Sequence, residues 1–226
     1  MAERPVFHVI DKAPFYERIN TEFTFYSGFA VSQKHKSIQS LHKSYLNRYP
    51  DRKILEASSK GDDELGIGLS AFNIEINKEG HNYKLESVFQ GSKVFEDGEG
   101  CHDLYDAEPI VAKKDERVKS GKPLKCFDYF GEIFPLEPKD YFYNWIYINA
   151  LNDRIRDNGS LCAYDSFTDI EFNPNKSINC QAIASAIYVG LCRNNLIDEA
   201  LKSKEDFLRI VYNTGYEKAS EQLSMF

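Results

Sequence analysis

The stretch Leu85–Lys93, LESVFQGSK, brings an acid, an amide and an amine together at a spacing that could do chemistry. Glu86, Gln90 and Lys93 stand at positions i, i+4 and i+7, so on a helix their side chains share one face. An acid, an amide and an amine along one helix face fit the polar ends of a ligand better than they fit an ordinary solvent-exposed surface. The same spacing also fits an amphipathic helix with an ordinary Glu–Lys face, because structural ion pairs produce such patterns.

A second concentration of polar residues lies in Tyr164–Asn179, YDSFTDIEFNPNKSIN. Its charged and amide side chains include Asp165, Asp169, Glu171, Lys176 and Asn179. Cleavage of a glycosidic bond needs an acid for the leaving group and a group that stabilises an oxocarbenium-like centre. A carboxylate of this segment could therefore act with Glu86 on a sugar. Equally, Asn179 could cap the following helix and the acids could form a hydrated loop.

The elements that must position these residues are read from periodicity and from Gly and Pro positions. Aromatic and β-branched runs predict strands at Phe7–Ile10, Phe23–Val31 and Arg52–Ser59. Helices are expected over Ser37–Tyr49, Tyr83–Phe95, Ala107–Lys119, Lys139–Arg156, Cys180–Asn194 and Asp198–Tyr212. We expect an α+β fold that is predominantly α-helical, formed by one domain over residues 1–226. A small β element stands near its N-terminus, and 198–226 forms a C-terminal helical segment.

Composition narrows the class of protein. The 226 residues are 42% hydrophobic, which favours a folded protein over disorder, and the net charge is −7. That negative charge gives no support for sequence-independent DNA binding. A local basic groove is still compatible with the sequence. Residues that could build it are Lys34, His35, Lys36, His42, Lys43 and Arg48.

Cysteine usage and hydropathy bear on the compartment. Five cysteines without a C-x-x-C pair favour neither a disulfide framework nor a zinc site, so we expect no metal and a cytoplasmic location. No run of ~18 apolar residues predicts a membrane span. The G-x-G at Gly66–Gly68 is not followed by a helix signature, and no cofactor is expected.

Three motifs in order resemble those of NADAR domains, the YbiA-like family of N-glycosidases. LESVFQGSK resembles the family's (S/V)EH-aromatic-FQ-x-x-K signature. FYSGF resembles its F-S-N-F segment, in which Ser27 and Phe29 match. AYDSFTD…NKSIN resembles its D-x-x-W…GKGKN loop, in which Asp165, Lys176 and Asn179 match. Together the motifs span most of the chain.

The departures from the family pattern suggest a subgroup. Gly28 stands where the family has Asn, and Thr168 stands where the loop has Trp. A second family Trp has no match, and Phe134 is the nearest candidate. The interval 30–84 is longer than in compact members and is interpreted as a subgroup-specific insertion. The chain resembles the subgroup encoded beside DarT-type DNA ADP-ribosyltransferase toxins.

The resemblance implies a hydrolase, an antitoxin that removes ADP-ribose from guanine bases of DNA, most naturally single-stranded. Glu86 would protonate or orient the leaving group. Lys93 would act as an amine nucleophile or hold a phosphate or hydroxyl group, and Asp165 would activate water or bind ribose hydroxyls. The remaining expected substrate contacts are an aromatic wall of Phe29, Phe89 and Phe134, the cations Lys34 and Lys176, and the polar residues Ser27, Gln90, Asp169 and Asn179.

Two other functions stay open on the sequence. Compact YbiA-like members are linked to hydrolysis of riboflavin-pathway intermediates, so a small metabolite is an alternative substrate. A non-catalytic antitoxin that binds ADP-ribose or its toxin partner is the other. An acid–amine pair such as Glu86 and Lys93 favours an enzyme, and the long interval 30–84 favours a large substrate such as DNA over a free metabolite.

Overall fold

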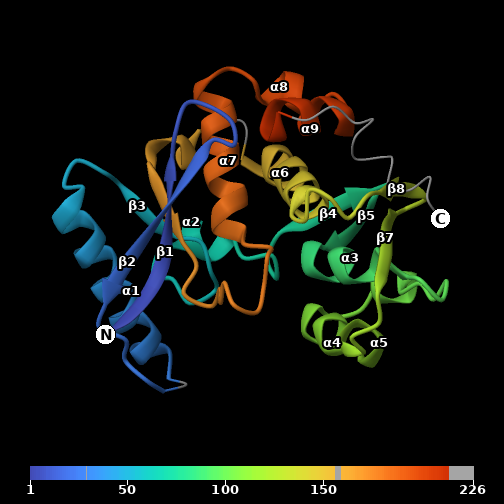
Figure 1. Ribbon diagram of the computed structural model, residues 1–226, viewed down its shortest axis with the longest axis horizontal. Helices are drawn as coiled ribbons and strands as arrows, with labels where there is room; N and C mark the ends of the chain where they lie inside the picture. Colours follow the sequence, from blue (N-terminus) through green and yellow to red (C-terminus); the bar gives the residue numbers. More distant parts are fainter. Residues whose placement is uncertain (29, 156–158, 214–226) are drawn as a thin grey trace.

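The N-terminal residues form most of a four-stranded sheet in a computed structural model that describes residues 1–28, 30–155 and 159–213 (Figure 1). Across this sheet the strands are β2 (Tyr16–Phe23), β1 (Ala2–Val9), β9 (Ser166–Thr168) and β3 (Ile54–Glu56). β1 is antiparallel to both β2 and β9, whereas β3 runs parallel to β9. β9 therefore carries the 164–179 segment into the middle of the sheet.

The two faces of this sheet are covered by different helices. α1 (Val31–Arg48) packs on one face, where Val6 and Phe23 meet Leu41 and Tyr45. Phe7, the neighbour of Val6 in β1, points to the other face and joins the main core with α7 (Gln181–Arg193). This separation follows from the alternation of side chains along a strand.

The other half of the molecule is built on a second antiparallel sheet and short helices (Figure 1). The strands are β6 (Lys93–Phe95), β7 (Leu124–Tyr129) and β8 (Glu132–Phe134), with a separate hairpin of β4 (Glu75–Lys78) and β5 (His81–Lys84). The remaining helical elements of the chain, of which α2 contacts β3 and η2 contacts α7, are α2 (Glu64–Gly68), α3 (Leu85–Gly91), η1 (His102–Leu104), α4 (Pro109–Lys114), α5 (Glu116–Lys119), α6 (Tyr141–Ile155), η2 (Ser160–Ala163), α8 (Ile197–Ala200) and α9 (Lys204–Tyr212).

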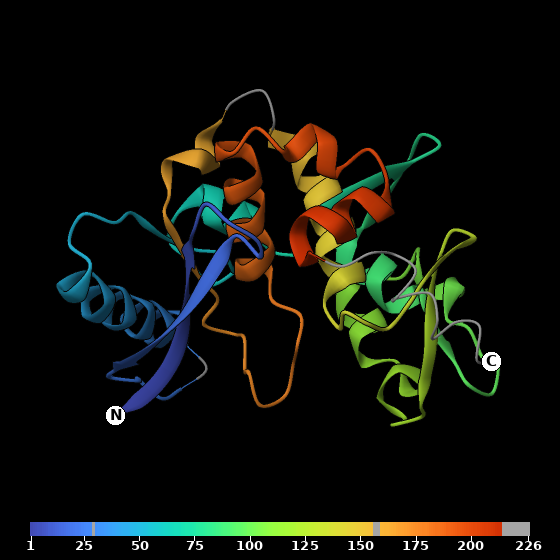
Figure 2. The same ribbon diagram turned by 45° about the horizontal axis from the view of Figure 1, so that its top comes forward.

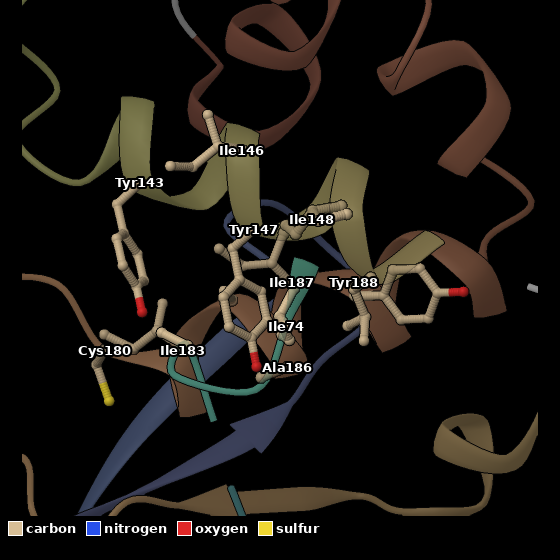
Figure 3. Packing of buried hydrophobic residues seen from close by; sticks show 14 of the residues in the cluster. Ile74, Tyr143, Ile146, Tyr147, Ile148, Cys180, Ile183, Ala186, Ile187 and Tyr188 are labelled. Carbon is tan, nitrogen blue, oxygen red and sulfur yellow. The ribbon is translucent and has the colours of Figure 1, made fainter. Parts of the chain in front are cut away.

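The core between the two halves is formed by α6 and α7. Both helices are apolar nearly all round, which is the pattern of buried helices. Figure 3 shows Tyr147 of α6 packed against Ile187 of α7 and against Ile74. The Tyr147 hydroxyl donates to the Leu69 carbonyl at 2.6 Å, so the chain before α3 is tied to this core.

The segment between β9 and α7 lies between the N-terminal sheet and the half that contains α3, α4 and α5 (Figures 1 and 2). Both ends of this segment are anchored, by the sheet at Thr168 and by α7 at Gln181. In the part of the chain that is described, no helix is both long and apolar enough to cross a membrane.

The α+β class is confirmed, but several predicted boundaries are wrong. A strand was expected over Phe23–Val31. Instead, β2 ends at Phe23, and α1 begins at Val31. The helix expected over Tyr83–Phe95 is only α3, because the chain after Ser92 pairs with β7 as a strand. Two other expected helices are each divided in two.

Each of these two expected helices is interrupted by a residue whose side chain caps a new helix. The Asp115 carboxylate accepts from the Arg117 N–H and starts α5 inside the span expected as one helix over Ala107–Lys119. Ser203 accepts from the Asp206 N–H and starts α9 inside the span expected over Asp198–Tyr212. A side chain that satisfies a free N–H at a helix start favours a new helix there.

Candidate functional site

Ala71 joins the beginnings of α3 and α7. Its N–H donates to Gln181 Oε1 at 2.9 Å, and its carbonyl accepts from the Glu86 N–H at 3.1 Å. Gln181 is the first residue of α7 and Glu86 is the second residue of α3. The structure therefore brings the LESVFQGSK helix beside the end of the 164–179 segment, a proximity that sequence alone did not reveal.

Glu86 is a buried carboxylate with two partners. The residue is 5% exposed, and its Oε1 accepts from Gln90 Nε2 at 2.9 Å, one helical turn away. Lys113 Nζ of α4 lies 3.5 Å from the same oxygen. A negative side chain in the first turn is also favoured by the partial positive charge of a helix N-terminus.

Lys93 reaches the same region from β6 rather than from α3. Its Nζ lies 5.3 Å from the centroid of the Phe89 ring. Burial lowers the pKa of the Lys93 ammonium, the nearby Glu86 carboxylate opposes this, and the charge of Lys113 adds to the lowering. An amine with a lowered pKa holds more of the neutral, nucleophilic form. Lys93 therefore interacts electrostatically with Glu86 from a strand, and not from the helix face that the i+7 spacing predicted.

Lys113 is a site residue that the sequence analysis missed. Its Nζ lies 5.2 Å from the centroid of the Phe72 ring as well as 3.5 Å from Glu86 Oε1. Phe72 follows Ala71, so Lys113 lies over the junction of α3 and α7. The sequence predicted a helix over Ala107–Lys119, and α4 lies within it, but no spacing related that helix to Glu86.

The pKa of Tyr143 responds both to Glu86 and to Asp169 of the 164–179 segment. Burial raises the pKa of its hydroxyl well above the ordinary value, and the charges of Tyr147, Glu86, Cys180 and Asp169 raise it further. Figure 3 shows Tyr143 pointing from α6 toward Cys180. A tyrosine in these surroundings stays protonated and can donate a hydrogen bond.

Asp169 is the acid of the segment that lies nearest this group. Its Oδ1 accepts from the N–H groups of Glu171 and Phe172 at 3.0 and 3.2 Å. Burial of the carboxylate, and next the charge of Glu56, raise the pKa of Asp169 to about 8. Burial raises the pKa of Glu56 as well, so the two buried acids hold a proton at a higher pH than free carboxyl groups do, and Asp169 can act as the proton donor of this pair.

Glu56 and Thr168 form a buried polar cluster behind Asp169. Glu56 accepts hydrogen bonds from Ser58 Oγ at 2.5 Å, Thr168 Oγ1 at 2.6 Å and the Ile170 N–H at 2.8 Å. Thr168 Oγ1 is also 2.8 Å from His42 Nε2. Thr168, which stands where the family has Trp, is 0% exposed and acts here in packing and hydrogen bonding.

Asp165 is not brought to Glu86. It precedes β9, whereas Asp169 follows that strand. Its carboxylate accepts from the Lys53 N–H and from Arg193 Nη2, each at 3.0 Å. Burial would raise the pKa of Asp165, but the hydrogen bond from the Lys53 N–H and the contact with Arg193 outweigh it and hold the pKa below its usual value. Among the described residues these contacts give Asp165 an anchoring position instead of the expected place beside Glu86.

Two buried amide oxygens close to these residues have no hydrogen-bond partner in the described part of the chain. They are Gln90 Oε1 and Asn179 Oδ1. A buried acceptor left unsatisfied costs about 1–3 kcal/mol, so such groups are usually kept for a ligand or water. Both residues belong to motifs from which substrate contacts were expected.

A family model described as DarT1-associated NADAR antitoxin matches residues 2–221. The chain belongs to this family. No curated protein matches it. The NADAR match covers both polar segments and the whole interval 30–84, so all the residues that surround Glu86 lie within it.

Other residues expected at the NADAR site have different surroundings. Phe134 is 0% exposed, with its ring centroid 5.0 Å from that of Phe142, so the prediction that it stacks a base is wrong. Phe89 is 7% exposed and packs edge-on to Tyr143. Phe29 lies outside the described residues.

The remaining expected contacts lie toward the surface. Lys34 was expected to bind a phosphate, but its Nζ forms an ion pair with Glu171 at 2.8 Å. Ser27 and Lys176 are both exposed, on the segment before α1 and on the segment before α7. Among the described residues, no cluster of three or more His, Cys, Asp and Glu could hold a metal ion.

Proposed function

We propose that this protein is an antitoxin enzyme that hydrolyses the N-glycosidic bond between ADP-ribose and a guanine base of DNA. It would thereby reverse the modification made by a DarT-type toxin. The observation that carries the proposal is the buried Glu86, which contacts Lys113, acts electrostatically on Lys93 and is joined through Ala71 to the start of α7. Membership of the antitoxin family supports the same direction.

The first step needs an acid. The guanine amine attached to ribose C1 is part of a hemiaminal, so proton transfer to the ribose ring oxygen lets the ring open to an imine. Asp169 in its neutral form can supply that proton, and the Glu86 carboxylate can accept one from the attacking amine or water. Tyr143, which stays protonated, can donate a hydrogen bond to the oxygen on which the electron pair is left.

The second step needs a nucleophile. The neutral amine of Lys93 adds to the imine carbon, and expulsion of the guanine amine, which takes up a proton, leaves an imine between Lys93 and the sugar. Water then adds to that imine, and cleavage of its carbon–nitrogen bond releases ADP-ribose and restores the lysine amine. In the alternative route water attacks directly and Lys93 only positions the substrate by its charge.

The groups around Glu86 suit the rest of ADP-ribose. Gln90 Oε1 and Asn179 Oδ1 are free acceptors for ribose hydroxyls. Lys113, whose side chain is 54% exposed, can move from Glu86 to a phosphate without a large desolvation cost. The exposed Lys176 is a second cation for the diphosphate.

The test is a single-stranded oligonucleotide that a DarT-type toxin has ADP-ribosylated on guanine. We expect the protein to release free ADP-ribose and to return the oligonucleotide to its unmodified mass, and we expect Glu86→Gln to lose this activity. Tight binding of ADP-ribose without release would favour a non-catalytic antitoxin. Hydrolysis of small N-ribosides with no action on the oligonucleotide would favour a metabolic N-glycosidase.

A further inference from the structure

Phe72 is an aromatic residue beside Glu86 that the core does not use. Its neighbours Ala71 and Ile74 are 3% and 0% exposed, whereas Phe72 is half-buried and belongs to none of the hydrophobic clusters of the described residues. Within that part of the chain its ring contacts no other ring. The ring is covered instead by Lys113, whose Nζ lies 5.2 Å from its centroid. A ring that has only a charged side chain over it can offer that face to a ligand.

Hydrogen bonds fix the backbone on both sides of Phe72. Before it, Ala71 is bound through its N–H to Gln181 and through its carbonyl to Glu86. After it, the Ile74 carbonyl accepts from the N–H of Leu85, the first residue of α3, at 3.0 Å. The ring is therefore carried by a segment that is tied to the start of both α3 and α7.

Lys113 connects the Phe72 ring with the Glu86 carboxylate. Its ammonium group lies 3.5 Å from Glu86 Oε1 while it also lies over the ring. The side chain of Lys113 is 54% exposed and that of Glu86 is 7% exposed, so Lys113 is the member of the pair that faces solvent. α4, which carries Lys113, packs against α3 (Figure 1). A ligand that takes the place of this ammonium group would lie between the carboxylate and the ring.

We propose that Phe72 stacks the guanine base of the substrate and that Lys113 covers the ring only until the substrate binds. This rests on the proposed function, in which Glu86 acts at the bond between ribose and guanine. The guanine is attached to the carbon at which that bond breaks, so it lies beside Glu86. The adenine of the same substrate is separated from that bond by two riboses and a diphosphate, so it lies away from Phe72.

The strengths of the two contacts favour the exchange. Contact of an exposed ammonium group with an aromatic ring changes an equilibrium constant by about 2- to 5-fold, whereas stacking of a base on such a ring changes it by about 5- to 100-fold. The base therefore displaces Lys113 from Phe72. The ammonium group that is released is free to bind a phosphate of the substrate.

The first experiment places a fluorescent reporter at the ring. Phe72→Trp is combined with Glu86→Gln, which keeps the modified oligonucleotide intact, and Glu86→Gln alone reports the signal of Trp145, the one natural tryptophan of the chain. We expect the modified oligonucleotide to quench the emission of Trp at position 72, because the guanine stacks on the indole. Free ADP-ribose, which has no guanine, should leave this emission unchanged.

The second experiment measures affinity for the modified oligonucleotide in variants that keep Glu86→Gln. Phe72→Leu keeps an apolar side chain but has no aromatic face, and we expect its affinity to fall about tenfold, whereas Phe72→Tyr stays near the parent value. The affinity for free ADP-ribose should be unchanged in both. The matched control is Tyr49→Leu, which removes another half-buried ring, at the end of α1, and should keep the parent affinity. Tm is measured on every variant.

The third experiment tests the cover. Guanosine is the probe because it has no phosphate for a lysine to bind, and its binding is followed by quenching of Trp in Phe72→Trp. Lys113→Met should tighten binding of guanosine about 2- to 5-fold, because no cation has to be displaced from the ring. Lys114→Met, which removes the neighbouring exposed lysine, should leave the affinity unchanged.

Three results would overturn the inference. The first is parent affinity for the modified oligonucleotide in a folded Phe72→Leu protein. The second is equal quenching of Phe72→Trp by free ADP-ribose, which would place the adenine on the ring. The third is weaker binding of guanosine in Lys113→Met, which would make Lys113 a contact of the base and not a cover. If the wild type hydrolyses nothing, the proposed function is rejected, and the quenching measurements still decide whether guanine lies on Phe72.

Discussion

Replacing Glu86 with glutamine separates the chemistry of this carboxylate from its structural contacts. Glutamine has the same size, and its side-chain oxygen can still accept from Gln90 Nε2. Lys113 loses an ion-pair partner, but its side chain is 54% exposed, so water can solvate it. A pair of this kind contributes at most about 1 kcal/mol, and for a chain of this length that corresponds to a shift in Tm of about 2–4 °C.

The effect of Glu86→Gln on hydrolysis should be much larger. Loss of a general acid–base group lowers kcat by about 10²–10⁴-fold, which raises the activation barrier by about 2.7–5.4 kcal/mol. The assay is release of ADP-ribose from the modified oligonucleotide at saturating concentration, with Tm measured on the same preparation. A variant that keeps its Tm and near-normal kcat would remove Glu86 from the mechanism.

The pH dependence tests the electrostatic part of the same reasoning. Burial lowers the pKa of Lys93, the Glu86 carboxylate raises it and the Lys113 charge lowers it. If neutral Lys93 is the nucleophile, the rate increases with pH as its ammonium loses a proton. Glu86→Gln should move this increase to lower pH, whereas Lys113→Met should move it to higher pH. Shifts of the two variants in the same direction would refute the assignment to Lys93.

Three further predictions concern single residues. Borohydride added during turnover should trap a covalent adduct at Lys93 that Lys93→Arg abolishes, and an active, untrapped Lys93→Arg protein would identify water as the nucleophile. The pKa of about 8 lies above the unfolded value near 4, so the folded state keeps a proton on Asp169 and loses stability as pH rises between these values. Asp169→Asn should therefore raise Tm more at pH 8 than at pH 5, and an equal change at both would contradict this. Contact with the Cys192 thiol lowers the pKa of Cys162 to about 7, so at pH 7.5 alkylation followed by mass spectrometry should modify Cys162 well before the buried Cys180, and equal rates would refute it.

Local spacing predicted the part of the site that is local in structure. Glu86 and Gln90 were expected on one helix face because they are four residues apart, and both belong to α3, where their side chains are in hydrogen-bond contact. The start of α7 was also predicted within one residue, since Gln181 begins an apolar helical run after a polar segment.

Contacts made by tertiary partners escaped the sequence. Lys93 leaves the helix because β6 pairs with β7, and the partner of Lys93 in that pairing is Phe127. Asp165 and Asp169 stand at opposite ends of β9, a strand of only three residues, Ser166–Thr168. No period can be read from three residues, so the sequence could not assign which acid is buried near Tyr143 and which contacts Arg193.

The interval 30–84 illustrates the same limit on a larger scale. Its extra length suggested an insertion, but its residues hold both polar segments in place. Ala71 binds the start of α3 through its carbonyl and Gln181 through its N–H. Glu56 receives hydrogen bonds from Thr168 and the Ile170 N–H, on both sides of Asp169. A buried carboxylate is tolerated when its acceptors are satisfied, and removal of a partner leaves a costly charge. The geometry around Asp169 and Glu86 therefore depends on this interval.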